Sequence, residues 1–420
     1  MKKLFTILLA LSMLALCACT PAGEDAKPQV FSAGYARADI TPENGTILGG
    51  YGDKDRFSEG ALDYLYTTCV AVSDGSGDPV LLMTSDMVRG DWADELRKAV
   101  SEATGVPIDN VIHATTHTHS GAEPQLEGGY KQPLTEAMKK AATEAIADLA
   151  PAQIEIGSTQ VENLSFVRHY TTDTGIVIGD NFRPDGAGSI TGHTTQADSL
   201  LQVIRFNRGE KKPVVMINWQ GHPTLASTTM ANGKETRSLA SADYIGFCRS
   251  YVEDEQDCLF AFYLSGSGNL NAYSRIDGEG VKHPKVYGEK LGSAVVSVLS
   301  DMKAVETGTV SSTRKVHKGT SATGGALDLP FYAVQVGDIS FVTSQYEMFD
   351  TNARNIKDQT PFEMTFVLTL TNGKNGYMPT QECWDYEGCY EVGMCNYARG
   401  TAELMEKEYL QALQELHNGK

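Results

Sequence analysis

The chain has 420 residues, of which 35 are Lys or Arg and 53 are Asp or Glu, so its formal charge is −18. Such an acidic surface repels phosphate backbones and anionic headgroups, so the composition argues against a nucleic-acid partner. Hydrophobic residues make up 41% and charged residues 21%, which is ordinary globular usage and excludes disordered, collagen-like and coiled-coil chains.

The first twenty residues indicate export. Lys2 and Lys3 precede an apolar run over 4–16, which is too short for a transmembrane helix and matches the core of a secretory signal. Ala18 before Cys19 resembles the lipobox of bacterial lipoproteins, and ordinary cleavage after a small residue is the alternative. We therefore expect a signal peptide over 1–18, a lipid on Cys19 and a tether over 19–30. The tether would anchor a folded domain over 31–420 to a membrane of the bacterial cell envelope.

In the folded part, β-branched apolar runs alternate with helical periodicity, which is typical of an α/β architecture. In chain order, strands are predicted at 65–72, 79–84, 110–115, 153–156, 201–206, 214–219, 259–264, 331–336, 339–343 and 364–370. Helices are predicted at 91–103, 134–149, 243–252, 285–301 and 401–417. The last helix is expected to place Leu404, Leu410 and Leu413 on one face. The sequence shows neither an internal repeat nor a low-complexity linker. We therefore expect one large domain of mixed β-sheets flanked by helices, with 157–196 as its least regular stretch.

Six cysteines follow Cys19, at positions 69, 248, 258, 383, 389 and 395. An even number in an oxidising compartment permits three disulfides, so we expect structural bridges, with free buried thiols as the alternative. The spacing of six residues within the last three cysteines is not that of a CxxC zinc knuckle or redox pair.

Three of the nine histidines lie within seven residues. His113, His117 and His119 end an apolar strand, and alternation along an extended chain would put them on one face. Ligand-binding loops follow the carboxyl ends of strands in α/β sheets, and imidazole is both a common metal ligand and a natural base near neutrality. A second strand ends in Gly221-His222-Pro223, where the proline fixes the turn. Two imidazoles from separate strand ends predict a catalytic zinc site that needs a third ligand.

Further short motifs follow in order along the chain. They are Gly34 to Pro42, Gly49 to Gly52, Thr116 to Gly121, Gly221 to Thr224, Ser241 to Gly246, Ser344 to Glu347, Leu370 to Gly373, Gly376 to Thr380 and Glu387 to Glu391. Their order and spacing resemble the N-terminal catalytic domain of the neutral/alkaline, non-lysosomal ceramidases, over roughly residues 31–400. The resemblance implies a zinc hydrolase that cleaves the amide bond of an N-acyl lipid such as ceramide. The immunoglobulin-like C-terminal domain of the full-length enzymes is not expected in this chain.

The resemblance also implies roles for individual residues. One zinc ion would be held by His117, His222, Glu347 and Tyr377. Beside it, His119 would handle a proton or bind the substrate carbonyl, and Tyr390 would donate to the developing oxyanion while metal-activated water attacks the amide. Arg168 lies where the family has a basic stretch and would orient the substrate, with a solvated surface arginine as the alternative.

One segment departs from the family pattern. A Gly-Asp-Val-Ser-like stretch is replaced by 265–271, in which Asn269 and Asn271 stand at the Asp and Ser positions. A serine nucleophile is therefore not expected, and Asn271 is predicted to be a hydrogen-bonding substitute that contacts the substrate. The change leaves another N-acyl compound or another hydrolysable bond open as the substrate. The alternative to an enzyme is a non-catalytic surface lipoprotein that uses the same fold as a ligand-binding module.

Overall fold

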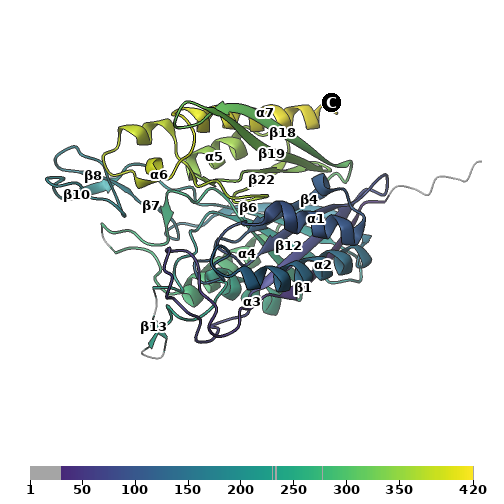
Figure 1. The fold of residues 1–420 in the computed structure, drawn as a ribbon. Helices are drawn as coiled ribbons and strands as arrows, with labels where there is room; N and C mark the ends of the chain where they lie inside the picture. Colours follow the sequence, from purple (N-terminus) through teal and green to yellow (C-terminus); the bar gives the residue numbers. More distant parts are fainter. Residues whose placement is uncertain (1–29, 229, 232–233, 277, 420) are drawn as a thin grey trace, which may run out of the picture.

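The computed structural model describes residues 30–228, 230–231, 234–276 and 278–419. The expected signal peptide and Cys19 lie outside the described residues. The described chain forms one domain of mixed sheets covered by helices (Figure 1), as predicted. Among the helices of these ranges, none combines the length and apolarity needed to cross a membrane.

The first five-stranded sheet has the order β4-β3-β2-β1-β5. Its strands are β1 (Ser32–Asp39), β2 (Tyr66–Ser73), β3 (Val80–Ser85), β4 (Val111–Thr115) and β5 (Ala150–Pro151). Only β3 and β4 among these neighbours run parallel. Helices α1 (Ala93–Thr104) and α2 (Lys131–Ala147) cover this sheet. Leu134, Met138 and Ala141 recur at helical spacing on α2, so that one apolar stripe faces the strands.

The second five-stranded sheet has the order β15-β12-β11-β6-β17. Its strands are β6 (Gln153–Gln160), β11 (Leu200–Asn207), β12 (Val214–Trp219), β15 (Leu259–Leu264) and β17 (Lys303–Val305). Here β12 and β15 form the parallel pair. Helices α3 (Tyr244–Gln256) and α4 (Pro284–Leu299) pack against each other and against this sheet. Pro284 begins α4, where its fixed φ suits the first helical turn.

The third sheet has four strands in the order β18-β19-β20-β22. These are β18 (Val310–Thr320), β19 (Ala326–Val336), β20 (Ile339–Thr343) and β22 (Met364–Leu368), with β20 and β22 parallel. Helices α5 (Asp350–Gln359) and α7 (Thr401–His417) lie on it (Figure 1).

The prediction for the buried face of α7 is wrong in part. Leu413 is buried and Leu410 is half-buried, but Leu404 is 49% exposed. Six residues turn a helix by about 600°, which is about 120° short of two full turns, so Leu404 and Leu410 lie on different faces of the helix. Met405 and Tyr409, which are buried, lie on the face that contacts the sheet.

The remaining elements are short. They are β7 (Phe166–Val167), β8 (His169–Thr172), β9 (Ile178–Gly179), β10 (Ile190–His193), β13 (Met230–Ala231), β14 (Lys234–Glu235), β16 (Leu270–Asn271), β21 (Glu347–Met348), β23 (Tyr377–Met378), α6 (Tyr390–Gly393) and the 3-10 turns Ile108–Asn110, Gly128–Tyr130 and Gln381–Asp385. The stretch 157–196 contains most of the small sheet β10-β8-β9, which projects from the body at the left of Figure 1.

The three large sheets share one core, in which Ile112, Tyr263 and Phe341 belong to the same buried cluster. Their parallel pairs are joined by hydrogen bonds near the strand ends. Thr369 N donates to Leu264 O at 3.0 Å, and Asn372 N donates to His113 O at 2.8 Å. The carboxyl ends of strands from all three sheets therefore meet at one place, where ligand sites form in α/β folds.

The six cysteines of the described ranges are all free thiols. The expected disulfide bridges are therefore absent from this part of the chain, and the prediction of bridging is wrong here.

Candidate metal centre

His117 and His119 lie in the segment after β4, at the place where the strand ends of the three sheets meet. His117 N donates to Met87 O at 2.9 Å, and the backbone of His117 has a positive φ of 66°. This left-handed conformation is unfavourable for a residue with a β-carbon, and such strain collects at functional sites. His119 N then donates to Pro223 O at 3.1 Å, which ties the first histidine segment to the turn that carries His222.

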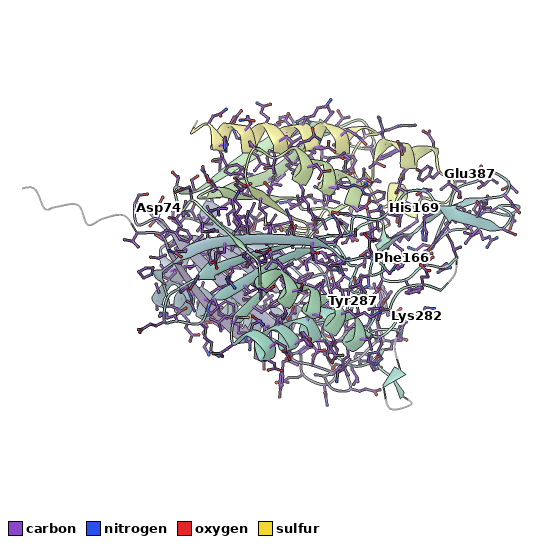
Figure 2. All side chains as sticks on the ribbon, turned by 180° about the vertical axis from the view of Figure 1, so that it is seen from behind. Asp74, Phe166, His169, Lys282, Tyr287 and Glu387 are labelled. Atoms are coloured by element: carbon purple, nitrogen blue, oxygen red, sulfur yellow. The ribbon has the colours of Figure 1, made fainter. Side chains whose placement is uncertain are left out.

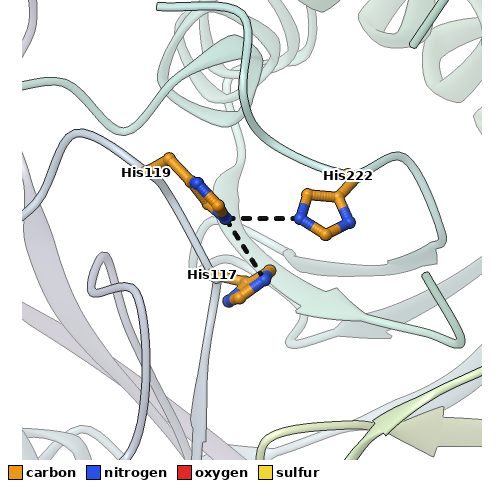
Figure 3. A group of neighbouring side chains, drawn as sticks. All are labelled: His117, His119 and His222. Carbon is orange, nitrogen blue, oxygen red and sulfur yellow. Dashed lines mark hydrogen bonds between the residues drawn. The ribbon is translucent and has the colours of Figure 1, made fainter. Parts of the chain in front are cut away.

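The three imidazole rings point toward one another (Figure 3). Nε2 of His119 lies 3.4 Å from Nε2 of His117 and 3.3 Å from Nε2 of His222. All three side chains are buried. These ring nitrogens lie as close as ligands around one cation, and the three residues form a group that could hold a metal ion.

The outer ring nitrogens fix the protonation of two rings. Nδ1 of His117 lies 2.5 Å from Val88 O, and Nδ1 of His222 lies 3.0 Å from Ser267 O. A carbonyl oxygen can only accept, so both Nδ1 atoms carry the proton. In the neutral rings, Nε2 of His117 and Nε2 of His222 are then bare lone pairs directed inward, which is the tautomer of a metal-ligating histidine.

Glu347 and Tyr377 approach from another side. They are Cα partners in the parallel pair of β21 and β23, which places both side chains beside the rings. Oε2 of Glu347 lies 3.2 Å from Nε2 of His117. This oxygen is buried and has no hydrogen-bond partner among the described residues. Two facing acceptors repel each other, and a cation between them would relieve that repulsion. The donor set of imidazoles and a carboxylate fits Zn²⁺.

Burial and the neighbouring charges shift the titration of these groups. Burial, followed by the rings of His117 and His222, lowers the pKa of His119 well below its ordinary value. Burial also lowers the pKa of His222 to about 3. For Glu347, burial raises the pKa of the carboxyl, but His117, His222 and Arg168 together bring it below its ordinary value. Neutral imidazoles beside an ionised carboxylate are the protonation states of metal ligands.

Two tyrosines and an arginine form the opposite wall. Tyr390 Oη donates to Tyr377 Oη at 2.8 Å. The Arg168 guanidinium carbon lies 5.6 Å from the Tyr377 ring centre and 5.7 Å from that of Tyr390. Nε of Arg168 bonds Oε1 of Glu391 at 2.8 Å, whereas its Nη2 is buried without a partner in the described structure. Arg168 is therefore a buried hydrogen-bond donor whose position is fixed by Glu391, and it is not a solvated surface arginine.

A cavity of about 510 Å³ joins these groups. His117, His119, His222, Glu347, Tyr377, Tyr390, Arg168 and Asn271 all line it. The structure thus brings every proposed site residue of the described chain to one cavity. Asn271 donates to Asp180, and Arg275 bonds the same carboxylate at 2.8 Å, so this side of the cavity wall is polar.

One expectation for this region is wrong. His113 does not share a face with His117 and His119. It stays within β4, where its Nε2 lies 2.9 Å from Ser85 Oγ, because the chain turns sharply at His117. Asn269 bonds Asp350 at 2.7 Å and lines a different cavity. Ser265 and Ser267 do not line the histidine cavity.

Sequence reasoning missed three supporting residues. Arg56 is buried and its Nη2 donates to His119 O at 2.5 Å. Asp180 and Arg275 lie on the polar wall described above. All three lie outside the short motifs. Only the fold brings Arg56 to the backbone of His119 and places Asp180 and Arg275 in the cavity wall.

Comparisons with known proteins identify the fold. No protein-family model and no curated protein sequence matches the chain. A crystal structure of neutral ceramidase from Pseudomonas aeruginosa matches with a TM-score of 0.74 and 15% identity, over 93% of this chain and 75% of that one. A ceramidase complexed with C2 matches with the same score and identity, over 93% and 76%. The chain therefore has the fold of neutral ceramidase.

Proposed function

We propose that this protein is a zinc-dependent hydrolase that cleaves the amide bond of an N-acyl lipid such as ceramide. One observation carries the proposal. The inward lone pairs of His117 and His222 face the unpartnered carboxylate oxygen of Glu347 inside a cavity of about 510 Å³. The likeness of fold to neutral ceramidase supports the class of reaction.

In this proposal His117, His222, Glu347 and Tyr377 hold the ion. When bound, zinc supplies a Lewis acid that polarises the substrate carbonyl and lowers the pKa of water. The buried ring of His119 is neutral, so it is free to accept the proton of the attacking water.

The tyrosine wall positions the substrate. The Tyr390 hydroxyl, which donates to Tyr377 here, would turn to the oxyanion that develops on the amide carbonyl. The unpartnered Nη2 of Arg168 offers a second donor, and Asn271 contributes a polar contact at the edge of the cavity. A neutral amide with polar groups near the carbonyl suits such a lining.

We further propose that the protein is exported and held at the membrane by a lipid on Cys19. The basic, apolar and small-residue pattern of residues 1–19 supports this location.

The decisive experiment combines metal analysis with a panel of N-acyl lipids of different head groups and chain lengths. We expect the purified protein to contain zinc and to release fatty acid from at least one lipid. A chelator should abolish the release, and added zinc should restore it. His117→Ala and His222→Ala should each lose the zinc ion of the histidine centre together with the activity.

His317→Ala is the matched control, because this histidine lies on β18, pairs with Glu408 of α7 and does not line the cavity. Wild-type protein that binds no zinc would overturn the proposal. A zinc protein that binds N-acyl lipids without turnover would instead support the ligand-binding alternative.

A further inference from the structure

A second group of metal-binding side chains lies behind Arg168. Nε2 of His169 is 3.1 Å from Oε2 of Glu391, and Sγ of Cys389 is 3.4 Å from the same oxygen. One donor atom from each of these three residues lies within 4.8 Å of the others. Cys389 also packs against the small buried cluster to which Cys383 belongs. The fold therefore gathers one imidazole, one carboxylate and one thiol, and it places a second thiol, that of Cys383, in the adjoining buried cluster.

The spacing of these atoms suits one tetrahedral ion. Two donors about 2.1 Å from a tetrahedral zinc ion lie roughly 3.4 Å apart, and a sulfur donor lies slightly farther out. The two distances to Oε2 of Glu391, 3.1 and 3.4 Å, are close to this separation. His169, Glu391 and Cys383 are each at most 3% exposed, so the ion would be enclosed as in a structural site.

The charges also favour a divalent cation. Glu391 is already paired with Arg168, so that ion pair is neutral and leaves a dication uncompensated. Two thiolates, from Cys383 and Cys389, would supply the two missing negative charges. Sulfur, imidazole nitrogen and carboxylate oxygen together select zinc over magnesium or calcium, which prefer oxygen ligands alone.

A separate cavity gives access to the cluster. It has a volume of about 350 Å³, and both His169 and Cys383 line it. Glu382, Glu403 and Glu406 also line it, against one arginine, Arg354, so its lining is acidic and attracts cations. Figure 2 shows His169 where the small sheet β10-β8-β9 joins the body, on the same side of the molecule as Glu387.

We propose that His169, Cys383, Cys389 and Glu391 form a second zinc site, separate from the histidine centre. Such a site would join β8 to the 3-10 turn Gln381–Asp385 and to α6. It would thereby fix Glu391, which holds the guanidinium of Arg168 in the first cavity. The second ion would act as a structural brace that positions Arg168 and does not touch the substrate.

Cobalt substitution tests this proposal directly, because the ligands proposed for the histidine centre include no sulfur. The purified full chain is stripped of metal under reducing conditions and titrated with Co²⁺. We expect a sulfur-to-cobalt charge-transfer absorption in the near ultraviolet. We also expect two zinc ions per chain in the zinc-loaded protein.

The variants separate the two sites. Cys383→Ser together with Cys389→Ser should remove the charge-transfer absorption and lower the zinc content from two to one. His117→Ala together with His222→Ala should also leave one zinc but keep the absorption. Cys395→Ser is the matched control, because its thiol contacts Tyr397 O and lies outside the cluster, and it should keep both signals.

Wild-type protein without the charge-transfer absorption would overturn the second site, whether or not the variants fold. A Cys383–Cys389 disulfide found by peptide mapping without reduction would overturn it equally, since no thiolate would remain. Neither result bears on the histidine centre, so failure here is distinguishable from failure of the proposed hydrolase.

Discussion

Nε2 of His117 and Oε2 of Glu347 face each other at 3.2 Å, although Nδ1 of the same ring is already committed to the Val88 carbonyl. Two acceptors at this distance are unfavourable without a cation between them. A substitution that removes this repulsion should therefore have two opposite effects: it should stabilise the metal-free protein and weaken the binding of the metal ion.

Glu347→Gln should weaken zinc binding and stabilise the metal-free protein. The amide can donate to Nε2 of His117, which gains about 1 kcal/mol of unfolding free energy in chelator. Loss of the carboxylate should lower the zinc affinity by at least about 10–100-fold, the range seen even for groups that only support a ligand. Competition with a chromophoric chelator and thermal unfolding measure the two effects. Exposed Glu43→Gln should change neither, and an unchanged zinc affinity in Glu347→Gln would exclude this residue as a ligand.

Tyr390→Phe should lower kcat by about 10²–10³-fold, because one donor to the developing oxyanion is lost. Zinc content should be unchanged, since the hydroxyl of Tyr377 remains. The measurement is steady-state kinetics on whichever N-acyl lipid the wild type cleaves. Tyr64→Phe, at a side chain that is 66% exposed, is the control. A kcat equal to that of wild type would show that Tyr390 has no part in the reaction.

Gly50→Ala should disturb the histidine centre, because the added methyl group would collide with the ring of His119. A β-carbon at Gly50 would lie 2.6 Å from Cγ of His119, so the ring would have to move. We expect activity to fall at least about tenfold, in line with the sensitivity of catalysis to small displacements. Gly52→Ala is the matched control, because Gly52 also has a positive φ but no atom within 4 Å of the added carbon. Equal activity in the two variants would show that the position of His119 is unimportant.

Asp243→Asn should make stability less dependent on pH. Asp243 is fully buried at the start of α3, and burial raises its pKa from 3.8 to about 6. A carboxyl with a raised folded pKa contributes stability that is complete below its unfolded pKa and is lost as pH rises through its folded pKa. Wild type should therefore lose up to about 3 kcal/mol relative to the variant between pH 4 and 7. Urea unfolding over this range measures the difference.

Asp254→Asn, on the exposed surface of the same helix, provides the comparison for this pH series. Its unfolding free energy should follow that of wild type at every pH. A constant difference between wild type and Asp243→Asn would mean that Asp243 ionises alike in the folded and unfolded chain.

Cys19→Ala should release the protein from membranes. Wild-type protein expressed in a bacterial host should partition into the detergent phase, because a lipid on Cys19 carries it there. Cys17→Ala should partition as wild type does, since this cysteine lies within the expected signal peptide. If Cys19→Ala still enters the detergent phase, the lipidation proposal is wrong.

The local structure was largely predictable from the sequence. Each predicted strand and helix overlaps an observed element, because periodicity in buried segments such as 214–219 reflects which side chains face the core. The polar helix α5 was missed, because eight of its ten residues are polar or charged and the segment gives little apolar signal. Strands β1 and β18 were also missed, because alternation there is weak.

The site was predictable only in part. His117 and His222 could be proposed from their strand ends, whereas Glu347 and Tyr377 rested on the resemblance to a family. The departure of His113 from the site depends on one backbone torsion at His117, which no pattern of residue types records. The grouping of Cys389 and Glu391 with His169 depends on contacts between segments more than 200 residues apart.

The meeting of the three sheets has a thermodynamic consequence. His117 follows β4 of the first sheet, His222 follows β12 of the second, and Glu347 and Tyr377 follow β20 and β22 of the third. An ion bound by these residues would therefore link the three large sheets. Ion binding and sheet packing are then linked, and zinc at a hundredfold excess over its Kd would add about 2.7 kcal/mol to the unfolding free energy. A variant weakened by a cavity in the shared core, such as Phe341→Ala, should therefore regain unfolding free energy when zinc is added.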